Sequence, residues 1–153
     1  MAETRAPAIN VHATAIVVGT VGIVFTGPSG SGKSKLAFAC LAAARRARLF
    51  AALIADDQIF LESVNGHVIA RRPEPIAGLM EFRGTGIGTV ESLPHALVHL
   101  AVHPVISAES QRLPGENEQV ALTETISLPL LRLPVDTADP LAVLGVFQPD
   151  LHF

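Results

Sequence analysis

The fold is decided by Gly27-Pro28-Ser29-Gly30-Ser31-Gly32-Lys33-Ser34, a complete match to the pattern G-x-x-x-x-G-K-[ST]. Residues 21–25 before it are β-branched and apolar, and residues 33–47 after it have the composition of a helix buried against a sheet. A glycine-rich turn between a strand and a helix exposes backbone N–H groups that bind phosphate oxygens. In such a loop Lys33 would add positive charge and Ser34 would ligate magnesium. The stretch predicts a nucleotide-phosphate site, without distinguishing a kinase from an ATPase or GTPase.

A second candidate feature is a pair of acids at the end of a strand. Residues 50–55 are continuously apolar, as expected of a central strand covered on both faces, and Asp56 and Asp57 follow directly. Ligands of α/β sheets lie at the carboxyl ends of the strands. One acid can therefore bind a metal while the other accepts a proton from an attacking hydroxyl group. The alternative interpretation is a polar strand end that leads into the next hairpin.

The rest of the chain consists of short elements separated by glycine and proline. Residues 14–18 form a predicted strand, residues 58–63 and 67–71 a hairpin around Asn65-Gly66, and residues 95–103 one alternating strand. A polar loop is expected over 107–125, and a proline-broken strand followed by a helix from Pro140 over 128–147. The 153 residues thus predict a strand-rich α/β chain that forms one domain.

The composition argues against membrane and nucleic-acid-binding proteins. Apolar residues make up 49% of the chain and no charged residue occurs over 6–32, but glycine, proline and polar residues interrupt that stretch, so no transmembrane helix is expected. The net charge of −3 and the absence of Trp and Tyr argue against nucleic acid as a main partner. The amino terminus lacks a secretory signal pattern and Cys40 is the single cysteine, which predicts a cytoplasmic protein with a core thiol.

Two groups of polar side chains admit more than one interpretation. Glu81 and Arg83 would share one face of a strand, either as an acid for magnesium and a base for phosphate or as a surface ion pair. His95, His99 and His103 alternate onto one face of a strand, whereas the same spacing on a helix would suit zinc. Prolines on both sides of the histidine run favour the strand.

Taken together, these residues resemble the catalytic domain of the HPr kinase/phosphorylase family. Residues 6–147 carry the resemblance, in short segments that occur in the order known for the family. The segments are Val11-His12-Ala13-Thr14, the phosphate loop, Leu53-Ile54-Ala55-Asp56-Asp57, Glu81-Phe82-Arg83-Gly84-Thr85-Gly86-Ile87, Gln111-Arg112-Leu113-Pro114 and Leu133-Pro134-Val135.

The resemblance implies a phosphoenolpyruvate-carboxykinase-like variant of the phosphate-loop nucleotide-binding fold. It also implies an ATP-dependent serine kinase that acts on the phosphocarrier protein HPr or a nitrogen-branch paralogue, with phosphorolysis of phosphoserine as a further activity of the family. The catalytic residues that it implies are His12, Lys33, Asp57 and Arg112. ATP would be bound by Gly27, Pro28, Ser29, Gly30, Ser31, Gly32, Lys33, Ser34 and Asp56, and Mg²⁺ by Ser34 and Glu81.

The same resemblance implies a homo-oligomer, which is a hexamer in the family. It also implies a single catalytic domain over residues 1–153, without the N-terminal regulatory domain of the family. Two other functions remain open from the residues alone. The phosphate loop also suits a small-molecule kinase or nucleotidase, and a domain of this kind can serve as a non-catalytic nucleotide sensor.

Overall fold

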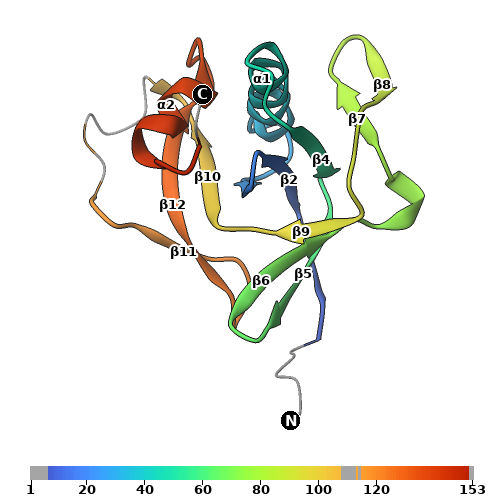
Figure 1. Cartoon of the computed structure of the whole chain (residues 1–153), viewed down its shortest axis with the longest axis vertical. Helices are drawn as coiled ribbons and strands as arrows, with labels where there is room; N and C mark the ends of the chain where they lie inside the picture. Colours follow the sequence, from blue (N-terminus) through green and yellow to red (C-terminus); the bar gives the residue numbers. More distant parts are fainter. Residues whose placement is uncertain (1–6, 108–112, 114, 152–153) are drawn as a thin grey trace.

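The computed structural model of the chain describes residues 7–107, 113 and 115–151. These residues form two α-helices, one 3-10 helix and three sheets (Figure 1). The strands are β1 (Ile9–Val11), β2 (Ala13–Val18), β3 (Val21–Thr26), β4 (Ala51–Ala55), β5 (Ile59–Val64), β6 (His67–Arg71), β7 (Leu79–Phe82), β8 (Gly86–Thr89), β9 (His95–Leu97), β10 (Leu100–Val105), β11 (Gln119–Ala121) and β12 (Ser127–Pro134). The helices are α1 (Lys33–Arg46), η1 (Glu74–Ile76) and α2 (Pro140–Phe147).

A mixed six-stranded sheet brings the phosphate loop and the acid pair to the same edge. Its strand order is β11-β12-β10-β3-β2-β4, with β3, β10 and β12 parallel to one another. Strand β2 is antiparallel to both of its neighbours, so β4 points the same way as β3. The carboxyl ends of β3 and β4 therefore lie at one edge, together with the amino end of β2. The predicted strand-rich α/β fold is confirmed.

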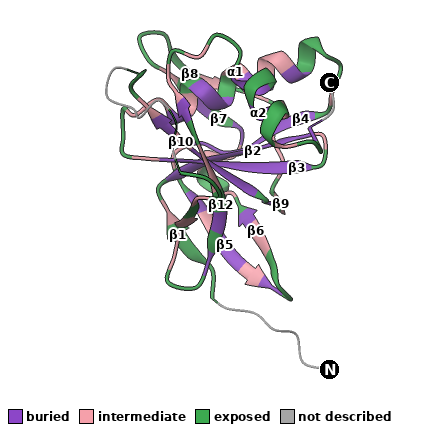
Figure 2. Cartoon of the chain, turned by 90° about the vertical axis from the view of Figure 1, so that its left-hand side faces the viewer, coloured by how far each residue is buried: buried purple, intermediate pink, exposed green. Residues whose placement is uncertain are grey.

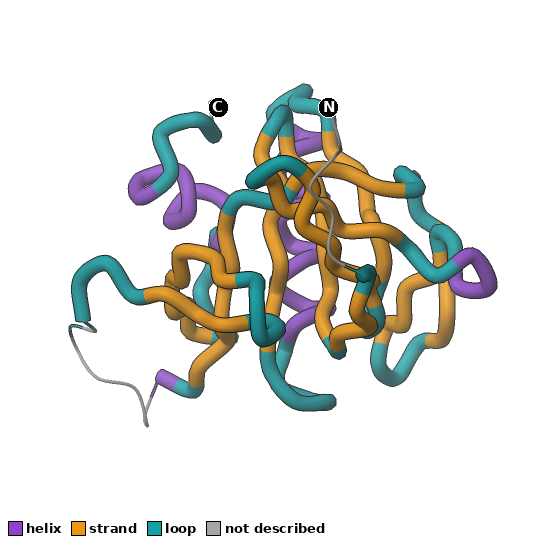
Figure 3. The backbone as a smooth tube through the Cα atoms, turned by 90° about the horizontal axis from the view of Figure 1, so that it is seen from below, coloured by secondary structure: helices purple, strands orange, loops and turns teal. Residues whose placement is uncertain are grey.

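The central sheet is covered on both faces. Helices α1 and α2 lie above it in Figure 1, and the antiparallel sheet β1-β5-β6-β9 contributes strands below it. Figure 3 gives the view from below, in which α1 runs behind the strands. One core cluster, with Phe25 and Leu36 among its members, lies between the helices and the sheet, and a second, with Ile54 and Leu61, lies between the two sheets. Accordingly β2, β3 and β4 are buried along their whole length (Figure 2).

Helix α1 packs through a broad apolar face, as its sequence predicts. Its buried apolar residues are Leu36, Ala37, Cys40, Leu41 and Ala44, which recur at the spacing of one helix face. Burial, and secondarily the charge of Asp139, raises the pKa of the Cys40 thiol to about 12. At neutral pH this thiol is therefore protonated, and the interpretation of Cys40 as a core residue is confirmed.

Two predicted connections are confirmed in detail. Asn65 and Gly66 join β5 to β6 with φ of 51° and 82°, the left-handed pair that a tight type I′ hairpin needs. Helix α2 begins at Pro140 after β12, and the Asp139 carboxylate accepts a hydrogen bond from the Ala142 N–H as its N-cap.

Neither helix of the described chain is long and apolar enough to cross a membrane.

The prediction of one alternating strand over residues 95–103 is wrong. The run divides into β9, which joins β6 in the lower sheet, and β10, which joins β3 in the central sheet. Between them the Val98 N–H donates to the Val68 carbonyl and the His99 N–H donates to the Gly22 carbonyl, so the chain changes partners at this point. Tertiary hydrogen bonding thus overrides the local alternation, and it also separates the three histidines.

Substitution of Gly22 by alanine is expected to destabilise the fold strongly. The backbone of β9 approaches β3 so closely that a Cβ on Gly22 would lie 2.0 Å from the Leu97 carbonyl oxygen and 2.7 Å from the Val98 Cα. Backbone atoms cannot rotate away, so we expect a loss of about 3 kcal/mol in the free energy of unfolding, measured by urea denaturation.

Gly19→Ala is the matched control. A Cβ on Gly19 meets nothing within 4 Å, and only its φ of +61° is unfavourable. The Gly19→Ala substitution should lower the free energy of unfolding by about 1 kcal/mol. Equal losses for the two variants would contradict the close approach at Gly22.

Candidate active site

The phosphate loop of residues 27–32 connects β3 to α1. Gly27, Gly30 and Gly32 have φ of 131°, 81° and 104°, values that side chains other than glycine rarely adopt. Gly32 is the N-cap of α1 and no side chain caps the helix, so its first N–H groups have no side-chain acceptor. A Cβ on Gly32 would lie 2.7 Å from the Val135 Cγ1, which makes glycine a packing requirement as well. The loop lines a cavity of about 530 Å³.

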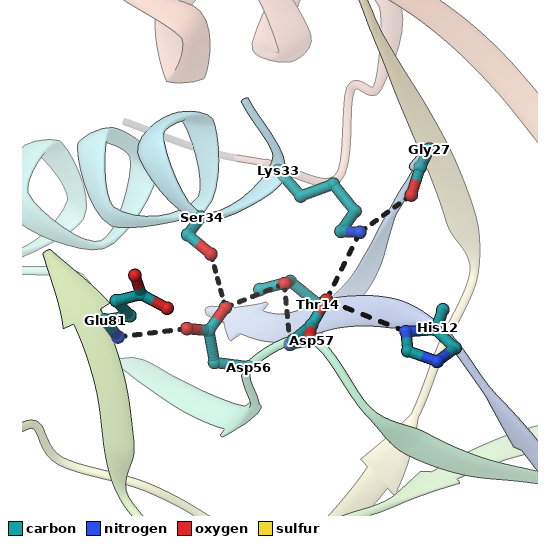
Figure 4. A network of polar contacts seen from close by, with 8 residues as sticks. All are labelled: His12, Thr14, Gly27, Lys33, Ser34, Asp56, Asp57 and Glu81. Atoms are coloured by element: carbon teal, nitrogen blue, oxygen red, sulfur yellow. Dashed lines mark hydrogen bonds and ion pairs between the residues drawn. The ribbon is translucent and has the colours of Figure 1, made fainter. Parts of the chain in front are cut away.

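Lys33 is the buried cation of this cavity. Its side chain is only 5% exposed, its Nζ donates to the Gly27 carbonyl oxygen at 2.7 Å, and the same Nζ lies 3.4 Å from the Asp57 Oδ1. Figure 4 shows the side chain extended toward both partners. The ammonium group is therefore held at the loop, where a bound phosphate would meet it.

Asp56 is fixed by three hydrogen bonds. Its Oδ1 accepts from the Thr14 hydroxyl at 2.9 Å and from the Ser34 hydroxyl at 2.5 Å, and its Oδ2 accepts from the Glu81 N–H at 3.1 Å (Figure 4). The residue is 9% exposed. Asp56 therefore connects β2, α1 and β7 at the wall of the cavity.

Asp57 presents its carboxylate in a different direction from Asp56. Its φ is 67°, a left-handed conformation that Asp tolerates better than most side chains. The side chain is 51% exposed, and its Oδ1 lies 3.4 Å from the Lys33 Nζ and 3.9 Å from the His12 Nδ1. Asp57 is thus the acid of the pair that an incoming group can reach, and it lines the same cavity as Lys33.

The donors around Ser34 fit a magnesium ion. Because the Ser34 hydroxyl proton points at Asp56, the oxygen lone pairs remain for a cation. Glu81 and Asp56 line the same cavity, and Figure 4 shows the Glu81 carboxylate turned toward Ser34. Among the described residues no three His, Cys, Asp or Glu side chains converge as a metal site. Magnesium does not need such a group, because it commonly binds one or two carboxylates together with phosphate oxygens and water.

Arg83 lies over the phosphate loop. A Cβ on Gly30 would be 3.6 Å from the Arg83 Nη2, so the guanidinium group covers one side of the cavity. None of the salt bridges found among the described residues joins Arg83 to Glu81. The position of the guanidinium group beside Gly30 favours the phosphate-binding interpretation. Beside it, Phe82 of the β7–β8 hairpin and Phe38 of α1 pack edge to face, with ring centroids 4.9 Å apart. The sequence patterns did not predict this hairpin as a wall of the cavity.

The remaining candidate residues lie in separate places. The loop residues Pro28, Ser29 and Ser31 lie between β3 and α1 with the glycines. Arg112 lies outside the described residues, so its catalytic role stays a prediction. His12 flanks Asp57 from the entrance to β2, with a side chain 71% exposed.

The three histidines of the 95–103 run do not form a metal site. The His99 Nδ1 accepts from the Gly22 N–H at 3.0 Å, and the His103 Nδ1 lies 3.1 Å from the Thr26 hydroxyl beside the phosphate loop. His95 lies on β9 in the other sheet. Burial, and then the nearby Arg132, lowers the pKa of His103, against an opposing effect of Glu118.

Known proteins that are similar to this chain are kinases, which agrees with a site built around a phosphate loop. The family model described as HPr Serine kinase C-terminal domain matches residues 3–145. The HPr kinase/phosphorylase of Clostridium beijerinckii is 33% identical over 93 residues, which cover 61% of this chain and 29% of that protein. The HPr kinase/phosphorylase of Xanthomonas campestris pv. campestris is 29% identical, covering 99% of this chain and 50% of that protein. The chain thus spans half or less of the length of these curated relatives.

A solved structure shows the same fold. The Hpr(Ser) kinase/phosphatase of Coxiella burnetii superimposes with a TM-score of 0.73 at 22% sequence identity, over 93% of this chain and 90% of that chain. The strand-rich α/β architecture, with one mixed six-stranded sheet, is therefore the fold of that solved structure.

Proposed function

Because the chain belongs to the HPr serine kinase C-terminal domain family, we propose that it is an ATP-dependent serine kinase. Its substrate would be an HPr-like phosphocarrier protein of a phosphotransferase system, or a nitrogen-branch paralogue. One observation carries the proposal: the accessible Asp57 carboxylate lies 3.4 Å from the Nζ of the phosphate-loop lysine. A base beside the phosphate ligand is what transfer to a hydroxyl group requires.

The proposed transfer uses each charged group for one task. The loop N–H groups and Lys33 hold the β- and γ-phosphates, and Arg83 covers them from the hairpin. As the seryl oxygen attacks the γ-phosphorus, Asp57 accepts its proton, and the bond from the γ-phosphorus to the bridging oxygen breaks to release ADP. His12, 3.9 Å from the Asp57 Oδ1, orients or charge-balances the carboxylate. Arg112 would close over the transferring group.

Magnesium would be held by Ser34 and Glu81, with Asp56 fixing the Ser34 hydroxyl. A magnesium ion held there would supply positive charge that offsets the negative charge of the transferring phosphate. The same residues would serve a second reaction, in which the phosphoryl group of phosphoserine passes to inorganic phosphate. In that reaction inorganic phosphate attacks the phosphorus, the bond from this phosphorus to the seryl oxygen breaks, and protonated Asp57 gives its proton to the seryl oxygen. The proton of the attacking hydrogen phosphate then restores protonated Asp57, and pyrophosphate leaves the site.

The proposal includes the location, the oligomeric state and the partner of the protein. The charge balance and the single cysteine support a cytoplasmic protein whose partner is the carrier protein rather than nucleic acid or membrane. The family resemblance supports a homo-oligomer. Lys33, Ser34 and the loop glycines would serve equally in a small-molecule kinase, a nucleotidase or a nucleotide sensor. The accessible carboxylate beside Lys33 favours a phosphoryl-transfer enzyme over a sensor.

The function is tested by incubating the protein with Mg-ATP and purified HPr-like carriers from the same genome. We expect phosphoserine on one carrier, detected by mass spectrometry, and none on the carrier variant whose acceptor serine is replaced by alanine. ATP consumption that is independent of any carrier would instead support a nucleotidase or a small-molecule kinase. Tight nucleotide binding without turnover would support a sensor. Phosphoserine on no carrier would overturn the proposal.

A further inference from the structure

Thr14 links the two acids of the site through a single hydroxyl group. The Thr14 Oγ1 donates to the Asp56 Oδ1 at 2.9 Å and accepts from the Asp57 N–H at 3.0 Å. Thr14 is 0% exposed, so no water can replace either bond without a rearrangement of β2. One side chain therefore fixes the carboxylate of Asp56 and the backbone of Asp57 at the same time (Figure 4).

The backbone at the acid pair has an irregular conformation that needs such a support. The pairing of β2 with β4 shifts by one residue, since Ala15 faces Ala55 whereas Ile16 faces Leu53. A β-bulge or similar irregularity changes the direction in which the neighbouring side chains point. Two residues after the end of β4, Asp57 adopts a φ of 67°, which costs a non-glycine residue about 1 kcal/mol or more. The hydrogen bond from its N–H to Thr14 holds this turn in place.

The turn gives the two adjacent carboxylates separate positions. Asp56 points into the protein, where it accepts the hydrogen bond of Ser34, and Asp57 points toward Lys33. In a regular strand two consecutive side chains would point to opposite faces of the sheet. The left-handed turn instead lets both acids line one cavity, on the metal side and the lysine side.

We propose that Thr14 is a positioning residue for phosphoryl transfer, which sets the base Asp57 relative to the Ser34–Asp56 pair. This inference rests on the proposed kinase function. Thr14 is fully buried and does not line the cavity, so it would act through the two acids. Nothing in the phosphate-loop pattern or in the acid pair identifies it, because its role arises only when β2 lies between β3 and β4.

The test compares Thr14→Val, which keeps the size of the side chain and removes both hydrogen bonds, with Thr14→Ser, which keeps the hydroxyl group. We expect Thr14→Val to lower kcat for carrier phosphorylation by about 10- to 100-fold, with KM for Mg-ATP changed by less than about threefold. Thr14→Ser should retain kcat within about threefold. A residue needed only for packing would give the opposite order, since valine fills the apolar space better than serine.

A second readout does not depend on transfer. Hydrogen exchange of the Asp57 amide, followed by NMR, should be faster in Thr14→Val than in the wild type and in Thr14→Ser. Equal exchange in the three proteins, or an unchanged kcat in Thr14→Val, would overturn the inference. If the wild type phosphorylates no carrier, the kinase proposal fails by itself, and the exchange comparison alone decides whether Thr14 positions Asp57.

Discussion

Asp57→Asn is expected to lower the rate of carrier phosphorylation by about 10²- to 10⁴-fold, which is the usual contribution of a general base. The Kd of Mg-ATP should change by less than about threefold, because the loop N–H groups and Lys33 are retained. Asparagine has nearly the same shape and also tolerates a φ of 67°. The substitution therefore removes the proton acceptor while the hydrogen bond from its N–H to Thr14 can persist.

The rate is measured with saturating carrier and the Kd by isothermal titration calorimetry. Asp150→Asn, which removes an exposed carboxylate outside the cavity, is the matched control and should behave like the wild type. Near-normal transfer by Asp57→Asn would show that another group accepts the seryl proton.

Lys33→Ala is expected mainly to weaken the binding of Mg-ATP. The Nζ is the only cation that the described structure places both against the Gly27 carbonyl and beside Asp57. Hydrogen bonds to charged groups contribute about 1.5–3 kcal/mol, so the Kd of Mg-ATP should rise by about 10- to 100-fold. Calorimetric titration with Mg-ATP measures this change.

Arg46→Ala provides the control for Lys33→Ala, since it removes an exposed cation at the far end of the same helix. It should leave the Kd within about twofold of the wild-type value, because the charge is distant and screened by salt. An unchanged affinity in Lys33→Ala would mean that phosphates bind elsewhere on the protein.

Local patterns were sufficient to predict much of this site. The phosphate loop depends on glycines and one lysine within eight consecutive residues, and the acid pair depends on an apolar strand that stops at Asp56. Both are local features of the sequence. Their meeting at one edge also follows from the fold class, since strands of α/β sheets end in ligand sites.

Other parts of the site depend on long-range packing. Thr14 becomes important only because β2 runs antiparallel between β3 and β4, and no periodicity in the sequence shows this. The same is true of His99, whose contact with Gly22 divides an alternating run between two sheets. Arg83 reaches the phosphate loop because the β7–β8 hairpin packs against α1. The closely spaced glycines of the hairpin predict an unusual backbone conformation there, but they do not predict this packing.

The most direct measurement of the central claim is the stoichiometry of a single turnover with the wild-type protein, Mg-ATP and the carrier. ADP and phosphoserine are quantified over time, in parallel with a reaction that lacks the carrier. A site built from Lys33 and Asp57 for transfer to serine should form the two products in equal amounts, with negligible ADP when the carrier is absent. ADP formed without the carrier, or in large excess over phosphoserine, would contradict the account.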